Sequence, residues 1–188
     1  TIKSIQTTAI PARGRARTKL DYYGYTARRY SWLCGLEGDT NNYAGFSTGN
    51  TGNANPVECI WRNASGYATK GIAVDPTVYH EYQVVLTPKQ IQFIVDGTVV
   101  HVVDCSHTNY PTTSQLYSAK HHVYNNTQYI DWTEVDAMTG PKYIDNFERG
   151  LPAELWTTYN NCIYDSGGIR LTNNQTSVNG EAYYLPGL

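Results

Sequence analysis

The sequence has little charge, a single methionine and no long apolar run. Asp, Glu, Lys and Arg make up 16% of the 188 residues, against about 25% in an ordinary soluble domain. The sequence has too few Ala, Leu, Glu and Lys residues to favour helical bundles or coiled coils. No run reaches the roughly 18 apolar residues of a membrane helix. A net charge of −2 argues against nucleic acid as a partner.

Residue types that favour strands take the place of the missing charge. There are 17 tyrosines and 16 glycines, and Tyr, Thr, Val and Ile suit a pleated, half-buried surface. The clearest segment is a meander over 79–104, in which Asp96-Gly97 predicts a type I′ hairpin turn. Further strands are expected at 2–10, 30–36, 43–46, 57–62, 67–74, 116–124, 128–137, 142–147, 162–165, 168–172 and 181–185. We predict an all-β fold, a two-sheet antiparallel β-sandwich or jelly roll.

Four basic residues alternate with small or apolar ones near the N-terminus. They are Arg13, Arg15, Arg17 and Lys19. A period of two places all four on one face of a strand. A solvated outer face is the favoured interpretation, and a stripe that binds an anionic glycan or a partner protein is the alternative.

Four widely spaced cysteines predict disulfides. No two of them form the close CxxC pairs of a zinc site, and disulfides indicate an oxidising compartment. We favour Cys34–Cys59, because these two lie on strands joined by one loop, which leaves Cys105 and Cys162. Four free, buried thiols are the alternative.

Three Asn-x-Ser/Thr sequons agree with export, although each is a weak signal in a chain rich in Asn and Thr. They begin at Asn63, Asn125 and Asn174. Together with the cysteines they predict an extracellular or cell-surface protein.

The central meander resembles a known signature. Residues 79–97 (YHEY…TP…IQFIVDG) are similar to the hairpin of family 16 glycoside hydrolases, in the concanavalin A-like lectin/glucanase superfamily. Residues 130–135 resemble the closing strand of that family. Residues 145–150 and 167–171 resemble its opening and second strands, yet they follow the closing strand here. Joining Leu188 to Thr1 would restore the family order, so the chain resembles a circular permutant.

We expect one domain over 1–188. Its body would be residues 1–138. Its tail, residues 142–188, would supply the opening strands, either to its own chain or to a neighbouring subunit.

The resemblance does not extend to the catalytic carboxylates. Family members carry E-x-D-x-E before the YHxY hairpin, and retaining glycosidases need two such groups. The corresponding stretch here, 39–48, has no carboxylate after Asp39. Glu134 and Asp136 belong to the closing strand and lack the third acid. A polysaccharide lyase would need a Glu where Lys19 stands. We therefore predict that the protein is not an enzyme.

The resemblance also implies a structural calcium ion. Its ligands would be the carboxylate of Asp131 and the carbonyls of Asn146 and Gly167, with water completing the six to eight oxygens that Ca²⁺ takes. The alternative is that Asp131 caps a turn or binds backbone amides.

Two functions fit this sequence. The preferred one is an extracellular structural subunit that assembles with copies of itself, through addition or exchange of its terminal strands. The alternative is a lectin-like carbohydrate-binding module, whose aromatic residues stack on sugar rings. Its candidate residues are Trp32, Tyr43, Trp61 and Tyr67. Core packing is favoured for the two tryptophans.

Overall fold

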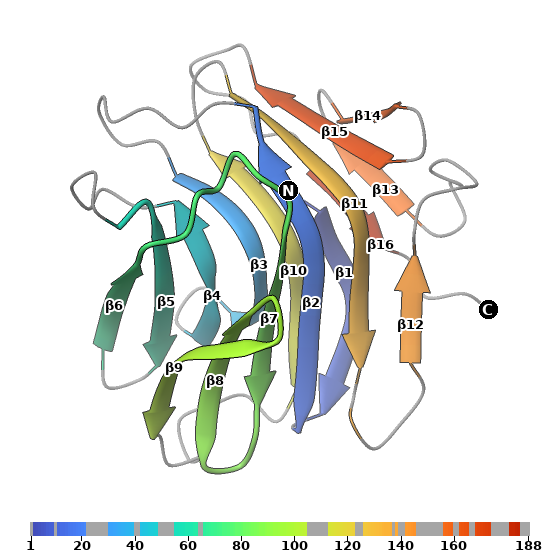
Figure 1. Ribbon diagram of the computed structural model, residues 1–188. Helices are drawn as coiled ribbons and strands as arrows, with labels where there is room; N and C mark the ends of the chain where they lie inside the picture. The colour runs from blue at the N-terminus through green and yellow to red at the C-terminus, as the bar shows by residue number, and fades with distance from the viewer. Residues whose placement is uncertain are drawn as a thin grey trace.

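The computed structural model is a sandwich of two β-sheets (Figure 1). It describes the backbone at residues 2–9, 11–21, 30–39, 42–48, 55–63, 66–104, 113–122, 126–136, 138, 142–145, 156–159, 162–165, 168–173 and 181–184. It describes side chains at 11–21, 31–37, 42–48, 55–63, 66–104, 127–135 and 138. Within these residues every regular element is a strand, and no helix has the length and hydropathy of a membrane span.

The first sheet has eight strands in the order β13-β16-β1-β10-β3-β4-β5-β6. These strands are β13 (Trp156–Tyr159), β16 (Glu181–Tyr184), β1 (Ile2–Ala9), β10 (Thr113–His122), β3 (Tyr30–Asp39), β4 (Asn42–Thr48), β5 (Val57–Asn63) and β6 (Gly66–Ile72). All neighbours in it are antiparallel except β1 and β16, which pair in parallel.

The second sheet follows the order β14-β15-β11-β2-β7-β8-β9, and β12 pairs with β11 beside this path. Its strands are β14 (Cys162–Asp165), β15 (Gly168–Asn173), β11 (Asn126–Asp136), β2 (Ala12–Leu20), β7 (His80–Leu86), β8 (Gln90–Val95), β9 (Thr98–Asp104) and β12 (Lys142–Asp145). The predicted all-β, two-sheet sandwich is confirmed.

The strands of the tail pair within the two sheets of their own chain. β12 returns along β11, so that Thr133 lies opposite Asp145. β15 pairs with the other end of β11, where Ile130 lies opposite Ile169. Both are neighbours of the closing strand, as the permuted order requires. Figure 1 shows β12 and β15 beside β11.

The core lies between the sheets and follows from alternation along each strand. On β2 the buried residues are every second one, from Ala12 to Leu20. Phe46 of the first sheet contacts Tyr82 and Phe93 of the second, with ring centroids 5.2 and 5.4 Å apart. All three rings are fully buried, so they join the two layers.

The hairpin between β8 and β9 has the predicted turn. Asp96 and Gly97 both have positive φ, 48° and 77°, as a type I′ turn requires. The Asp96 carboxylate also accepts the backbone N–H of Glu81 and binds Nδ1 of His80 at 2.6 Å. The turn is therefore tied to the start of β7.

Tyr82→Phe is expected to raise the free energy of unfolding by about 1 kcal/mol, because a buried hydroxyl without a partner costs about 1–3 kcal/mol. The Tyr82 hydroxyl is buried and has no hydrogen-bond partner among the described residues, and its burial raises the pKa of Tyr82. Tyr43→Phe is the control: that hydroxyl hydrogen-bonds Arg62, so its loss should not stabilise. Urea unfolding of both variants measures the difference, and a less stable Tyr82→Phe would contradict the argument.

Candidate functional site

The middle of the first sheet presents the outward side chains of β4. Ala44 and Phe46 are fully buried in the core. Neighbouring residues of a strand point to opposite faces, so Tyr43, Gly45 and Ser47 lie on the outward face. The central strand therefore carries no carboxylate at these three positions.

Trp32 covers the centre of this outward face. A Cβ atom added to Gly45 would lie 2.4 Å from Cζ3 of Trp32, and one added to Gly35 would lie 3.2 Å from the same atom. The two glycines are paired across β3 and β4. Trp32 also meets Tyr43 edge to face, with ring centroids 5.4 Å apart. The indole thus fills the space above two adjacent strands where side chains are absent.

A row of polar and aromatic side chains crosses the same face. The register places Glu37 of β3 opposite Tyr43, Tyr43 opposite Arg62 of β5, and Arg62 opposite Tyr67 of β6. Burial raises the pKa of Tyr43, although a hydrogen bond with Arg62 partly opposes this. Tyr67 is 55% exposed. The row combines ring faces with hydrogen-bonding groups that reach solvent.

Two glutamates flank this row but stand far apart. Glu37 lies opposite Tyr43, whereas Glu58 lies opposite Ser47, four residues further along β4 and on its other side. With about 3.3 Å per residue and 4.8 Å per strand, their Cα atoms are roughly 16 Å apart. The two side chains therefore project from different strands, on opposite sides of β4.

Trp61 packs against the core, which is the interpretation favoured for both tryptophans, and so it leaves the group of four aromatic candidates, whereas Trp32 lies on the outward face. β5 alternates so that Trp61 points the same way as Val57 and Cys59, into the sandwich. Its ring lies 6.0 Å from that of Phe93 and packs against the core. Trp32, Tyr43 and Tyr67 remain together on the outward face.

The sequence interpretation missed two polar members of that face, Glu58 and Arg62. Both alternate with Cys59 and Trp61 in the run VECIWRN of β5. The sequence therefore showed the period of two along this strand, but it did not show which side of the sheet forms the core.

The predicted Cys34–Cys59 disulfide is not formed: both are free, buried thiols. Cys34 lies opposite Phe46, and Phe46 lies opposite Cys59, so β4 separates the two cysteines by about 9.6 Å. A disulfide needs Cα atoms within about 7 Å. Burial raises the pKa of both thiols, that of Cys59 to about 12. The side chains of Cys105 and Cys162 lie outside the described residues.

The carboxylate assigned to calcium has a protein partner. Asp131 accepts a hydrogen bond from Nη1 of Arg17 and is 38% exposed. Within the described side chains no three His, Cys, Asp or Glu residues gather around one point. The other two predicted ligands, Asn146 and Gly167, lie outside the described residues, so the calcium site stays a prediction.

The predicted glycosylation sites are not tested by the fold. Asn63 is the last residue of β5, where the chain turns toward Gly66 of β6. Asn125 and Asn174 lie outside the described residues. The extracellular location likewise stays a prediction.

The chain matches one protein family and a group of solved structures. The profile of glycosyl hydrolases family 16 matches residues 39–137, more than half of the chain. An uncharacterized protein from Mycobacterium paratuberculosis is similar in fold, with 19% identity and a TM-score of 0.51 over 71% of this chain and 72% of that one. A search of curated proteins finds no significant match.

Two further similar structures are those of a glucanase and of a pseudo-glucanase. A β-1,3-glucanase from Mycobacterium marinum is 18% identical over 61% of this chain and 53% of that one, with a TM-score of 0.47. An immunostimulatory antigen and pseudo β-1,3-glucanase of Mycobacterium tuberculosis is 17% identical over 60% and 54%, with a TM-score of 0.44. This chain therefore spans about half the length of each.

The prediction of a self-assembling structural subunit is wrong. The match to glycosyl hydrolases family 16 over residues 39–137 indicates a carbohydrate-related protein. Low charge and many Tyr, Thr and Asn residues suit any sandwich whose surface meets sugars, so they do not single out an assembly.

Proposed function

Since this chain belongs to family 16 of the glycosyl hydrolases, we propose that it binds a glucan-type polysaccharide on the outward face of β3–β6 without hydrolysing it. The observation that carries the proposal is the row of Tyr43, Arg62 and Tyr67 on three adjacent strands, all on one face. Aromatic rings with a polar edge suit a surface that is both apolar and wet.

The spacing of the row suits a polymer that lies across the strands. Tyr43 and Tyr67 are two strands apart, or about 9.6 Å, which is close to the length of two consecutive sugar rings. Arg62 lies between them and offers several N–H donors to sugar hydroxyls. Trp32, in contact with Tyr43, extends the aromatic surface toward β3.

The absence of hydrolysis is proposed from the same face. The outward positions described on β4 hold Tyr43, Gly45 and Ser47, none of which is a carboxylate, and the described glutamates beside them, Glu37 and Glu58, lie on different strands with Cα atoms roughly 16 Å apart. Hydrolysis by a retaining mechanism needs a nucleophile and an acid/base on either side of the glycosidic bond. Binding needs neither.

Tyr67→Ala is expected to weaken binding of a soluble β-1,3-glucan about tenfold, which corresponds to about 1.4 kcal/mol. Calorimetry measures the affinity, and release of reducing ends measures hydrolysis on the same sample. Val99→Ala, which shortens an exposed apolar side chain on the other sheet, is the control and should bind glucan normally.

Two results would overturn the proposal. One is equal glucan binding by the wild type and Tyr67→Ala. The other is steady release of reducing ends that disappears in Glu58→Gln or Glu37→Gln.

A further inference from the structure

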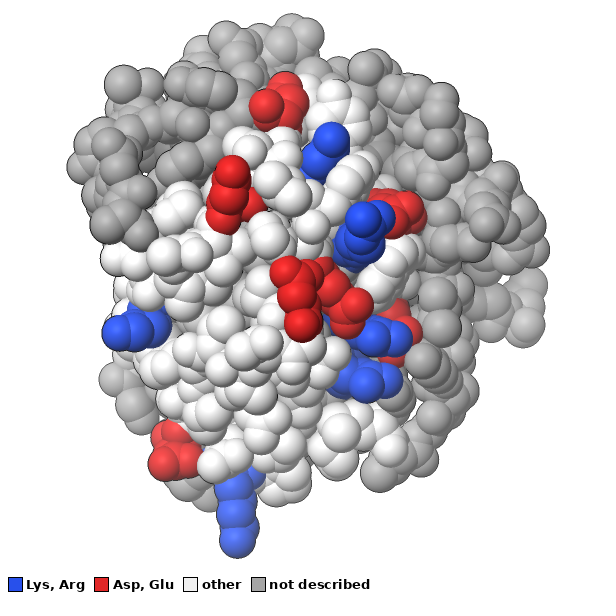
Figure 2. All heavy atoms as spheres, in the orientation of Figure 1, with Lys and Arg blue, Asp and Glu red and all other residues white. Residues whose placement is uncertain are grey.

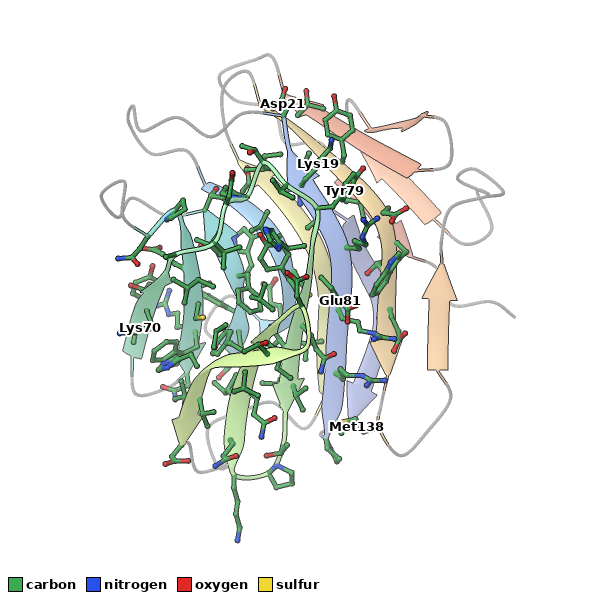
Figure 3. All side chains as sticks on the ribbon, in the orientation of Figure 1. Lys19, Asp21, Lys70, Tyr79, Glu81 and Met138 are labelled. Carbon is green, nitrogen blue, oxygen red and sulfur yellow. The ribbon has the colours of Figure 1, made fainter. Side chains whose placement is uncertain are left out.

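A second aromatic and basic cluster lies on the outward face of the other sheet. Lys19 of β2 lies directly opposite Tyr129 of β11. Its Nζ atom is 5.3 Å from the centroid of the Tyr129 ring and 4.8 Å from that of Tyr79, which precedes β7. The ammonium group is thus framed by two partly exposed rings. Figure 3 shows Lys19 beside Tyr79 at the same end of β2.

Lys19 differs from the other basic residues of this strand in having no acidic partner among the residues that the structure describes. Arg13 and Arg15 bind Glu134, and Arg17 binds Asp131. Within the part of the chain that the structure describes, the contacts of the Lys19 ammonium are the two rings. Figure 2 shows basic and acidic side chains in contact elsewhere on this face.

The nearest carboxylate along β2 is already engaged. Asp21 accepts the backbone N–H of Thr127 at 2.8 Å and forms no ion pair with Lys19 within the described residues. The Tyr79 hydroxyl stays protonated, because burial, with Asp131 nearby, raises the pKa of Tyr79. Among the described residues, the cluster therefore combines an ammonium group without an ion-pair partner, two partly exposed tyrosine rings and a hydroxyl donor; the Tyr79 ring also contacts the guanidinium of Arg17, 4.6 Å from its centroid.

We propose that Lys19, Tyr79 and Tyr129 form a second carbohydrate subsite, selective for a sugar unit that carries an acidic group. The ammonium of Lys19 binds the carboxylate or sulfate through a charge-assisted hydrogen bond. The tyrosine rings contact the C–H face of the sugar. This surface belongs to the sheet opposite β4, so the inference is independent of the glucan site.

Charge complementarity favours an acidic sugar over nucleic acid. The chain has a net charge of −2, and the described carboxylates nearest the cluster are engaged, Asp131 by Arg17 and Asp21 by the backbone N–H of Thr127. A closely spaced polyphosphate would meet these carboxylates, whereas nucleic-acid sites need a broadly basic surface. A single acidic group beside a sugar ring needs only one ammonium group, and Lys19 has no ion-pair partner within the part of the chain that the structure describes.

Lys19→Gln is expected to weaken binding of an oligogalacturonate about tenfold and to reduce the dependence of the affinity on salt. A sulfated glucan tests sulfate in place of carboxylate, and the neutral glucan and a single-stranded DNA oligonucleotide complete the set. Lys89→Gln, with the same change of charge in the exposed turn before β8, is the matched control. Lys19→Arg keeps the charge and should retain binding.

Selectivity separates this proposal from the first one. Lys19→Gln should leave neutral glucan binding unchanged, and Tyr67→Ala should leave oligogalacturonate binding unchanged. The proposal is overturned if Lys19→Gln and Lys89→Gln bind both acidic ligands equally, or if Lys19→Gln also loses the neutral glucan. Tighter binding of the DNA than of either acidic sugar would assign the cluster to nucleic acid instead.

Discussion

Glu134→Ala is expected to lower the free energy of unfolding by about 3 kcal/mol, at the lower end of what breaking a buried ion pair costs. The Glu134 side chain is 1% exposed. Its two oxygens bind different guanidinium groups, Arg13 at 3.0 Å and Arg15 at 2.6 Å. The hydrogen bond that Arg15 donates to Glu134 is also the main reason that the pKa of Arg15 is raised.

The cost arises from what alanine leaves behind. Without Glu134, Arg13 has lost this carboxylate, and Arg15 retains Glu81 at 3.1 Å. Both guanidinium groups lie against the sheet with a quarter of the side chain exposed, so water can reach them only in part. A charge that loses its buried partner is destabilising, even where the intact pair contributes little.

Asp131→Ala is the matched control for this experiment. It also removes a carboxylate from an arginine on the same face of β11 and β2. The pair that it breaks with Arg17 is about 40% exposed on both sides, and exposed pairs contribute about 0–1 kcal/mol. Urea unfolding at constant m-value compares the two variants. If both variants lost the same free energy of unfolding, the burial of Glu134 would not explain its contribution to stability.

Gly45→Ala is expected to lower the free energy of unfolding by about 2 kcal/mol, a typical cost of overpacking. The new Cβ would lie 2.4 Å from Cζ3 of Trp32 and 2.7 Å from the carbonyl oxygen of Cys34. The backbone oxygen belongs to the neighbouring strand and cannot move without disturbing the β3–β4 pairing. The indole must therefore lift off the sheet.

A double-mutant cycle with Trp32→Ala separates the two contacts. If the indole is the main obstacle, Gly45→Ala should cost less in the Trp32→Ala background, with a coupling of about 0.5–3 kcal/mol. Near-ultraviolet circular dichroism reports whether the indole environment changes. An additive cycle with an unchanged spectrum would contradict the proposed clash. The same contact means that a carboxylate cannot be added at position 45 while Trp32 stays in place.

Much of the fold could be predicted because its signals are local. Alternation over 79–104 and the Asp96-Gly97 pair define the β7–β8–β9 meander, since both depend only on neighbouring residues. The strand Trp156–Tyr159 was missed. Its four residues, WTTY, show no alternation of polar and apolar types. Its place at the edge of the first sheet comes from pairing with β16.

The candidate site was only partly predictable. Alternation placed the four basic residues on one face of β2. The carboxylates that bind the three arginines lie far along the chain, and Glu134 is separated from Arg13 by 121 residues. No local pattern reports such a contact. Equally, the sequence shows that Trp32 and Trp61 are aromatic residues of strands, and it does not show which face of each strand meets the core.

The sequence by itself determined the β class, the hairpin turn and the family resemblance, because each rests on residue types within a short span. Only the tertiary structure decided the order of strands across a sheet. That order inserts β4 between Cys34 and Cys59, turns Trp61 inward while Trp32 covers Gly45, and leaves Lys19 as the basic residue of β2 without a described acidic partner. The physical reason is that strand order and the choice of the buried face come from pairing and burial between distant segments, which no local pattern encodes.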